Sequence, residues 1–123
     1  MKPVKPEKAF QIETDQTALR LLVIADDMTG ALDTGVQFSK HGARVSVASS
    51  ESLCFPTETD VLVIDAETRH LNPDEACRRT GELAEWGRQA GVPYFYIKTD
   101  SGLRGNIGPA LKAAIDALGV RLA

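Results

Sequence analysis

Cysteine is scarce in this sequence, and its scarcity excludes the usual cysteine-based sites. The 123 residues contain 2 cysteines, Cys54 and Cys77. They stand too far apart for a CxxC metal knuckle and are too few for the disulfide framework of a small secreted domain. We therefore expect both to be reduced structural thiols in a cytosolic protein.

Long apolar runs and an excess of charge of one sign are missing as well. The longest strongly apolar run covers residues 21–25, far below the ~20 residues that span a bilayer. The chain has 14 basic and 17 acidic residues, a formal net charge of −3 and no block of like charges. These values argue against a membrane partner and against nucleic-acid binding through a broad basic face. A small-molecule partner fits them better.

The composition is that of a globular domain. A length of 123 residues corresponds to one domain, and 43% hydrophobic and 25% charged residues are ordinary values for a soluble protein. Residues 1–18 contain lysines, prolines and acids but lack the apolar stretch of a signal peptide. We therefore expect a flexible leader over residues 1–18, a folded part over residues 19–123 and a cytoplasmic location.

Short β-branched runs alternate with longer helical patterns from residue 19 onward. This alternation predicts an α/β fold of three layers, in which a mostly parallel sheet of about four strands carries helices on both faces. The strands are expected at residues 20–25, 44–48, 60–64 and 94–98. The first and third are continuous apolar runs, so we expect them at the centre of the sheet.

Three helices are predicted between and after these strands. The first covers about residues 29–40 and the last about residues 107–118. The middle helix has the clearest start, because Asn72 can cap free backbone donors and Pro73 suits the first helical position, and Gly91 ends it. Four strands are few for such a sheet, and the pattern ends on a helix, so we expect a partial domain.

Polar residues follow three of the four predicted strands, at the edge where parallel sheets bind ligands. Asp26 and Asp27 come after the first strand, and one of them could act as a base or both could bind a cation. In the alternative, Asp27 only caps the next helix and Asp26 is solvated. Arg69 comes after the third strand and could capture a carboxylate or phosphate, or form a salt bridge with Glu67 or Asp65.

The segment after the fourth strand carries the most information. Residues 98–108, KTDSGLRGNIG, combine charged and hydroxyl groups with glycines that lead into a helix, whose N-terminus can receive an anion. The segment matches neither the Walker loop nor the dinucleotide GxGxxG pattern. The polar side chains that suit an anionic ligand bearing hydroxyls are those of Lys98, Asp100, Ser101 and Arg104.

Three segments, taken in order, resemble the four-carbon acid sugar kinases, which phosphorylate threonate, erythronate and related acids with ATP. They are IADDMTGALDTGVQFSKHG at 24–42, DVLVIDAETRHL at 60–71 and KTDSGLRGNIG at 98–108. The resemblance covers about residues 20–118. Gly102 stands where the family usually has threonine, and Thr68 stands where serine commonly precedes the arginine.

This resemblance implies a function for the complete protein and a role for each matched residue. Residues 19–123 would be the N-terminal part of the acid-sugar-binding domain, with the ATP-binding C-terminal domain absent, and this fragment is expected to be inactive alone. Asp27 would be the catalytic residue that accepts the proton of the sugar hydroxyl. The expected substrate-binding residues are Asp26, Arg69, Lys98, Asp100, Ser101 and Arg104.

The resemblance also implies the partners. ATP and Mg²⁺ would serve the complete enzyme and be bound mainly by the missing domain, so we expect neither of them, and no metal-binding residues, in this chain. The partner would be a small-molecule acid sugar, and a homo-oligomer is left open. Two other functions are alternatives to a kinase. One is a receiver-type phosphoacceptor domain that uses Asp65, and the other is a catalytically inert small-molecule-binding remnant.

Overall fold

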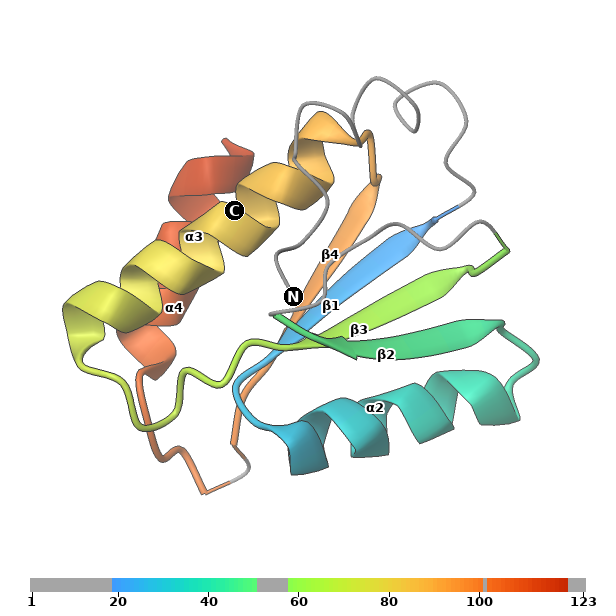
Figure 1. The fold of residues 1–123 in the computed structure, drawn as a ribbon, viewed down its shortest axis with the longest axis horizontal. Helices are drawn as coiled ribbons and strands as arrows, with labels where there is room; N and C mark the ends of the chain where they lie inside the picture. The colour runs from blue at the N-terminus through green and yellow to red at the C-terminus, as the bar shows by residue number, and fades with distance from the viewer. Residues whose placement is uncertain (1–18, 51–57, 101, 120–123) are drawn as a thin grey trace.

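A parallel sheet forms the middle of three layers in the computed structural model, which describes residues 19–50, 58–100 and 102–119 (Figure 1). The predicted leader at residues 1–18 lies outside this part. Every predicted strand and helix is present, with ends within one residue of the prediction. The elements are β1 (Leu21–Ala25), α2 (Met28–Lys40), β2 (Val45–Ser49), β3 (Val61–Asp65), α3 (Pro73–Gln89), β4 (Tyr94–Lys98) and α4 (Ile107–Leu118).

The strands follow the order β2-β3-β1-β4, and all three neighbouring pairs are parallel. β1 and β3 are therefore central, which confirms the prediction from their continuous apolar runs. Their last residues lie in register, since Ala25 at the end of β1 is level with Asp65 of β3 and with Lys98 of β4. This register brings the residues that follow the three strands to one edge of the sheet.

The two faces of the sheet carry separate cores because side chains alternate along each strand. One face packs against α3 and α4, and its cluster includes Leu22, Ile24, Leu62, Ile64, Leu83 and Ala114. The other face packs against α2, and its buried cluster consists of Val23, Ala25, Ala31, Val61 and Val63. The predicted three-layer arrangement with helices on both faces is confirmed (Figure 1).

Local residues fix where α3 begins and where α4 ends. The Asn72 carboxamide accepts the backbone N–H of Glu75 at 2.9 Å, and Pro73 occupies the first turn of α3, as predicted. At the other end of the chain, α4 ends at Gly119, whose φ of 68° lies in the left-handed region that glycine adopts readily. No helix in the described ranges is long and apolar enough to cross a membrane.

One buried hydroxyl on α3 offers a test of the core. The Oγ1 atom of Thr80 is buried and has no hydrogen-bond partner within the described part of the chain. Valine has the same shape and no hydroxyl to desolvate, so we expect Thr80→Val to raise the free energy of unfolding by about 1 kcal/mol. Urea denaturation followed by circular dichroism measures the change.

The matched control is Thr59, a second buried threonine. Its hydroxyl forms a hydrogen bond with the Ser46 hydroxyl at 2.9 Å. Thr59→Val removes that bond and should lower the free energy of unfolding by about 1 kcal/mol. If both valine variants changed stability in the same direction, the unpaired state of the Thr80 hydroxyl would not be the cause.

Candidate functional site

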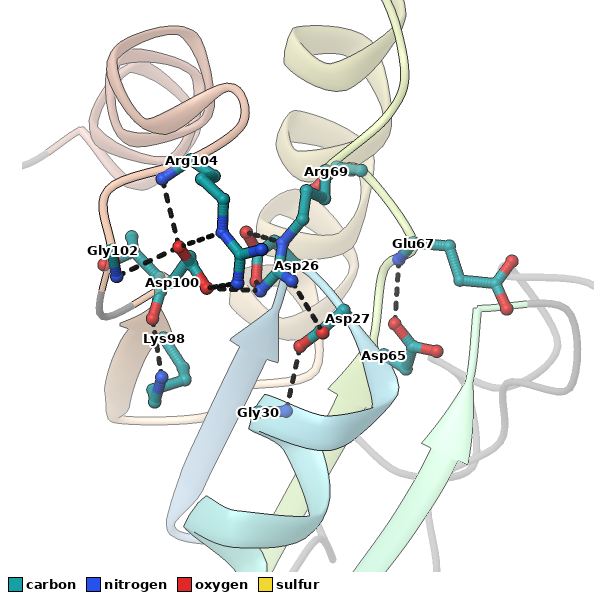
Figure 2. A network of polar contacts seen from close by, with 12 residues as sticks. Asp26, Asp27, Gly30, Asp65, Glu67, Arg69, Lys98, Asp100, Gly102 and Arg104 are labelled. Atoms are coloured by element: carbon teal, nitrogen blue, oxygen red, sulfur yellow. Dashed lines mark hydrogen bonds and ion pairs between the residues drawn. The ribbon is translucent and has the colours of Figure 1, made fainter.

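The predicted polar residues do meet at one edge of the sheet, beyond the ends of β1, β3 and β4. Figure 2 shows the arginines and aspartates of three loops pointing toward one another. This is the edge at which open parallel sheets bind ligands. Six of the seven predicted site residues are brought together there, and Ser101 lies outside the described residues. The six are Asp26, Asp27, Arg69, Lys98, Asp100 and Arg104.

Arg69 lies at the centre of this network (Figure 2). Its Nη2 is 3.3 Å from Asp26 Oδ1 and 3.1 Å from Asp100 Oδ1, and its Nη1 is 3.0 Å from Asp27 Oδ2. The guanidinium also donates through Nε to Asp26 Oδ2 at 3.3 Å. One mostly buried cation therefore holds three carboxylates that come from two different loops.

Asp100 is bound even more closely by its own loop. Arg104 donates through Nε and Nη2 to the two Asp100 oxygens, both at 2.8 Å, and the backbone N–H groups of Gly102 and Arg104 donate to Oδ2 at 3.0 and 3.1 Å. The Arg104 side chain, followed by its backbone N–H, holds the pKa of Asp100 well below its usual range. Asp100 therefore stays ionised and is a poor proton acceptor.

The acidic pair after β1 is divided between two environments. Asp27 caps α2, since its Oδ1 accepts the backbone N–H of Gly30 at 2.8 Å, so the capping role weighed above is confirmed. The second half of that alternative is wrong, because Arg69 covers Asp26 and leaves its side chain only 13% exposed, against 28% for Asp27. Asp27 is the more accessible carboxylate of the pair.

A cavity of about 280 Å³ opens between these loops and the start of α2. Six charged side chains line it, namely the acids Asp27, Asp33 and Asp100 and the bases Arg69, Lys98 and Arg104. Asp26 is not among the lining residues. Cations can hold the acid group of a small ligand, and carboxylate oxygens can accept hydrogen bonds from its hydroxyls. The cavity therefore suits a small anion that also carries hydroxyl groups.

Two residues that received no individual role from the sequence hold Arg69 in place. The Asn106 amide donates to the backbone oxygens of Thr68 and Leu71, at 2.9 and 2.6 Å, so it joins the loop after β4 to the loop after β3. Gly105 has φ 88°, and a Cβ there would come within 3.2 Å of the Arg69 Cα. Asparagine directly before a helix is usually a cap, but Asn106, which precedes α4, makes no side-chain cap hydrogen bond.

Asp65, at the end of β3, lies apart from the network (Figure 2). Its carboxylate is buried and accepts the backbone N–H of Glu67 at 3.0 Å. The salt bridge weighed above between Arg69 and Asp65 or Glu67 is not formed among the described residues, where Arg69 pairs with other aspartates. Burial of Asp65 also argues against the receiver alternative, because a phosphodonor must reach the acceptor carboxylate.

Burial raises the pKa of Asp65, and this gives a prediction about pH. An acid whose pKa is higher in the folded state loses stabilisation as the pH rises above the unfolded pKa of about 4. Asparagine keeps the shape and the acceptor oxygen but carries no charge. We expect Asp65→Asn to raise the melting temperature at neutral pH by several degrees and to leave it nearly unchanged near pH 4.

Thermal unfolding of both proteins at the two pH values provides the measurement. Asp74→Asn, at an exposed position in the first turn of α3, is the control and should not raise the melting temperature at neutral pH. A stabilisation by Asp65→Asn that is the same at both pH values would show that the charge of Asp65 is not its origin.

Comparison with known proteins gives one family and several kinases. The family described as "Sugar-binding N-terminal domain" matches residues 21–123. D-threonate kinase from Salmonella typhimurium is 42% identical over 106 residues, which are 85% of this chain and 25% of that protein. D-erythronate kinase from Heliobacterium modesticaldum is 36% identical over 104 residues, which are 80% of this chain and 23% of that protein. 3-oxo-tetronate kinase from Escherichia coli is 34% identical over 105 residues, which are 81% of this chain and 27% of that protein.

A solved structure is similar over the same region. The crystal structure of a domain of unknown function from Bordetella bronchiseptica, described as a domain-swapped dimer with bound citrate, has a TM-score of 0.76 at 31% identity. The similarity covers 80% of this chain and 26% of that chain. The chain therefore spans about a quarter of the length of the proteins that it resembles.

Proposed function

Since this chain belongs to the sugar-binding N-terminal domain of the four-carbon acid sugar kinase family, we propose that it forms the acid-sugar site of an ATP-dependent kinase. The substrate would be a four-carbon sugar acid such as threonate or erythronate. The single observation that carries the proposal is the cavity of about 280 Å³ lined by three acids and three bases. A sugar acid has one carboxylate and several hydroxyls, and this lining offers groups for both.

The cations that can meet the substrate carboxylate are Lys98 and Arg104. Both line the cavity, and the Arg104 side chain is 71% exposed, so a ligand can reach it without disturbing the core. A relative that binds citrate supports a carboxylate ligand for this fold. We assign Asp100 and Ser101 to the substrate hydroxyls. Asp26 does not line the cavity, so it would contribute to substrate binding through its ion pair with Arg69. Arg69, whose guanidinium already holds three carboxylates, would bind substrate mainly by fixing their positions.

Asp27 is our candidate for the catalytic base. It lines the cavity, whereas Asp26 does not, and Asp100 is held ionised by Arg104. In the proposed step the sugar hydroxyl oxygen attacks the γ-phosphorus of ATP, and the bond from that phosphorus to the bridging oxygen of ADP breaks. The Asp27 carboxylate takes the hydroxyl proton, so charge does not build up on the attacking oxygen.

ATP and Mg²⁺ are assigned to other parts of the complete enzyme. The described residues contain no group of three histidine, cysteine or acidic side chains able to hold a metal ion. The acids that come closest are already paired with arginines. The donor set of the described residues therefore does not fit a resident Mg²⁺. Residues 1–123 alone would then bind the sugar acid and not phosphorylate it, because ATP would be bound by other parts of the enzyme.

The test separates binding from turnover. Calorimetric titration of the 123-residue chain with D-threonate and D-erythronate should give heat of binding for one of them, and lactate, which has one hydroxyl, should bind more weakly. The full-length protein should then release ADP from ATP only when the same acid is present. Binding with no turnover by the full-length protein would favour the inert remnant, and no binding of either acid would contradict the proposed substrate class.

Assembly is part of the same proposal. A solved relative is described as a domain-swapped dimer, so a homo-oligomer of the full-length protein is the expected state. Light scattering of the full-length protein would measure its mass directly, and a monomer at all concentrations would remove this part of the proposal.

A further inference from the structure

Glu67, in the loop that follows β3, has a backbone conformation that glutamate rarely adopts. Its φ is 53°, in the left-handed region, and among the described residues other than glycine only Leu103 shares this feature. A Cβ makes this conformation costly, so it persists only where the surrounding structure holds it. The Glu67 side chain does not explain it, since this side chain is exposed, does not line the cavity and points away from the network (Figure 2).

The Asp65 carboxylate holds Glu67 in this conformation. Its Oδ1 accepts the backbone N–H of Glu67 at 3.0 Å, and Asp65 is only 2% exposed, so water competes little for the bond (Figure 2). An aspartate that bonds to the backbone two residues further on forms a local turn, which competes with continuation of the strand. β3 ends at Asp65. The turn therefore depends on a side chain that lies outside the network of arginines and aspartates.

The turn at Glu67 directs the next two residues onto the loop after β1. The backbone N–H groups of Thr68 and Arg69 both donate to the backbone oxygen of Asp26, at 3.1 and 3.3 Å. An ordinary conformation with negative φ would rotate the backbone at Glu67 by more than about 100° and turn both N–H groups away from that oxygen. The left-handed turn is therefore a condition for the Arg69 backbone to lie beside Asp26.

The contacts of Arg69 require this placement. Its guanidinium lies 3.0 to 3.3 Å from carboxylate oxygens of Asp26, Asp27 and Asp100. A planar group with donors in fixed directions can meet several partners only from one position. A displacement of about 1 Å at a reaction centre can lower the rate about a hundredfold. A shift of the Arg69 backbone should therefore be visible in the kinetics.

We propose that Asp65 is a positioning residue for the reaction, which places Arg69 among the three aspartates through the left-handed turn at Glu67. Asp65 touches neither the cavity nor the reacting groups, so it acts only through Arg69. The kinetic consequence rests on the proposed function, but it does not depend on which sugar acid is the substrate.

Other contacts hold the same loop and limit the expected loss. Asn106 donates to the backbone oxygens of Thr68 and Leu71, and the Arg79 Nη1 donates to the backbone oxygen of Ala66 at 3.1 Å. Loss of the turn should therefore displace Arg69 without releasing the whole loop. The effect on kcat/KM is expected to be smaller than that of removing the Arg69 guanidinium itself.

Two substitutions at Glu67 test the turn without touching the core. Both remove the same exposed carboxylate, but valine is β-branched and strongly disfavours a positive φ, whereas glycine adopts it readily. In the full-length protein Glu67→Val should lower kcat/KM for the sugar acid at least about tenfold. Glu67→Gly should stay within about threefold of the wild-type value, because the turn is kept.

Substitutions of Asp65 test the hydrogen bond that holds the turn. Asp65→Ala removes the acceptor and should lower kcat/KM as Glu67→Val does, whereas the conservative Asp65→Asn keeps an acceptor oxygen and should retain most of the activity. Adding Glu67→Gly to Asp65→Ala should restore most of the loss. The matched control is Asp60→Ala at the other end of β3, which also removes a carboxylate that accepts a backbone N–H, that of Arg44 at 2.8 Å, and should leave kcat/KM unchanged.

A double variant tests whether the turn acts through Arg69. Residues that act through one another have effects that do not add. Glu67→Val introduced into an Arg69→Gln protein should therefore lower kcat/KM by less than about twofold further. A full additional loss in that background would mean that Glu67→Val disturbs the site by another route, and it would overturn the proposal.

Hydrogen exchange followed by mass spectrometry gives a readout that needs no turnover. In the full-length protein the segment 66–71 should exchange at least about tenfold faster in Glu67→Val than in Glu67→Gly, because the bonds to Asp26 are lost. The segment of β2, residues 45–49, should be unchanged in both variants. If the wild-type protein phosphorylates no sugar acid while the exchange rates differ as expected, the proposed function fails and the placement of Arg69 by Asp65 stands.

Three further results would overturn the inference. They are wild-type kcat/KM in Glu67→Val, an equal loss in Glu67→Val and Glu67→Gly, and equal exchange rates of segment 66–71 in these two variants. If Asp65→Ala does not fold, the pair of variants at the exposed position 67 still decides the question.

Discussion

Replacing Asp27 by asparagine in the full-length protein is expected to lower kcat by about 100- to 10,000-fold, the range that a general base contributes. Asparagine cannot take the hydroxyl proton. It does cap helices as well as aspartate does, so its side-chain oxygen can still accept the Gly30 N–H and the start of α2 should be kept. KM for the sugar acid should therefore change much less than kcat.

Steady-state kinetics provide the measurement, because they report kcat separately from KM for the sugar acid. The matched control is Asp116→Asn, which removes an exposed aspartate that pairs with Lys112 on the surface of α4. Turnover equal to that of the control would show that Asp27 acts only as a helix cap.

Replacing Arg69 by glutamine should have the second largest effect, on both structure and activity. Arg69 is the cation shared by Asp26, Asp27 and Asp100, so its loss leaves three carboxylates close together with less compensation. We expect kcat/KM to fall at least about a hundredfold, as for the loss of one preorganised charged group at a reaction centre. The melting temperature should fall by several degrees.

Arg69→Lys should recover little of this loss. Arg69 reaches three carboxylates because its guanidinium is planar and presents donors at Nε, Nη1 and Nη2. A lysine ammonium is a single compact charge at the end of a flexible stem. An Arg69→Lys enzyme with wild-type kcat/KM would show that only the charge matters and not its geometry.

Arg78→Gln is the control for both changes at Arg69. Arg78 forms an ion pair with Glu82 one turn along α3, with both side chains more than half-exposed. Exposed pairs of this kind contribute little to stability. Both kcat/KM and the melting temperature should stay at their wild-type values in Arg78→Gln, and a loss as large as that of Arg69→Gln would contradict a special role for Arg69.

Much of the fold could be predicted from local patterns. Continuous apolar runs marked β1 and β3 as central because strands buried on both faces cannot alternate. Asn72 and Pro73 marked the start of α3 because capping depends only on neighbouring residues. The shared edge of the site could be predicted too, since parallel strands all end on the same side of their sheet.

The partners of charged side chains could not be predicted from sequence distance. The sequence placed Glu67 and Asp65 nearest to Arg69, yet the backbone turns the Asp65 carboxylate into the interior and brings Asp26, Asp27 and Asp100 to the guanidinium. The same limit applies to Asn106. Sequence patterns assigned it no individual role, because its amide donates to the backbone of a loop more than thirty residues away.

The sequence by itself determined the scarcity of cysteine, the balanced charge and the absence of long apolar runs, and its alternating patterns predicted the α/β fold. It also determined which residues gather at the ligand-binding edge, because strand ends follow from local apolar patterns. Only the tertiary structure decided that one arginine holds three aspartates and that the Asp65 carboxylate lies apart from them. Both depend on how separate loops and strands meet in space, which no local pattern records.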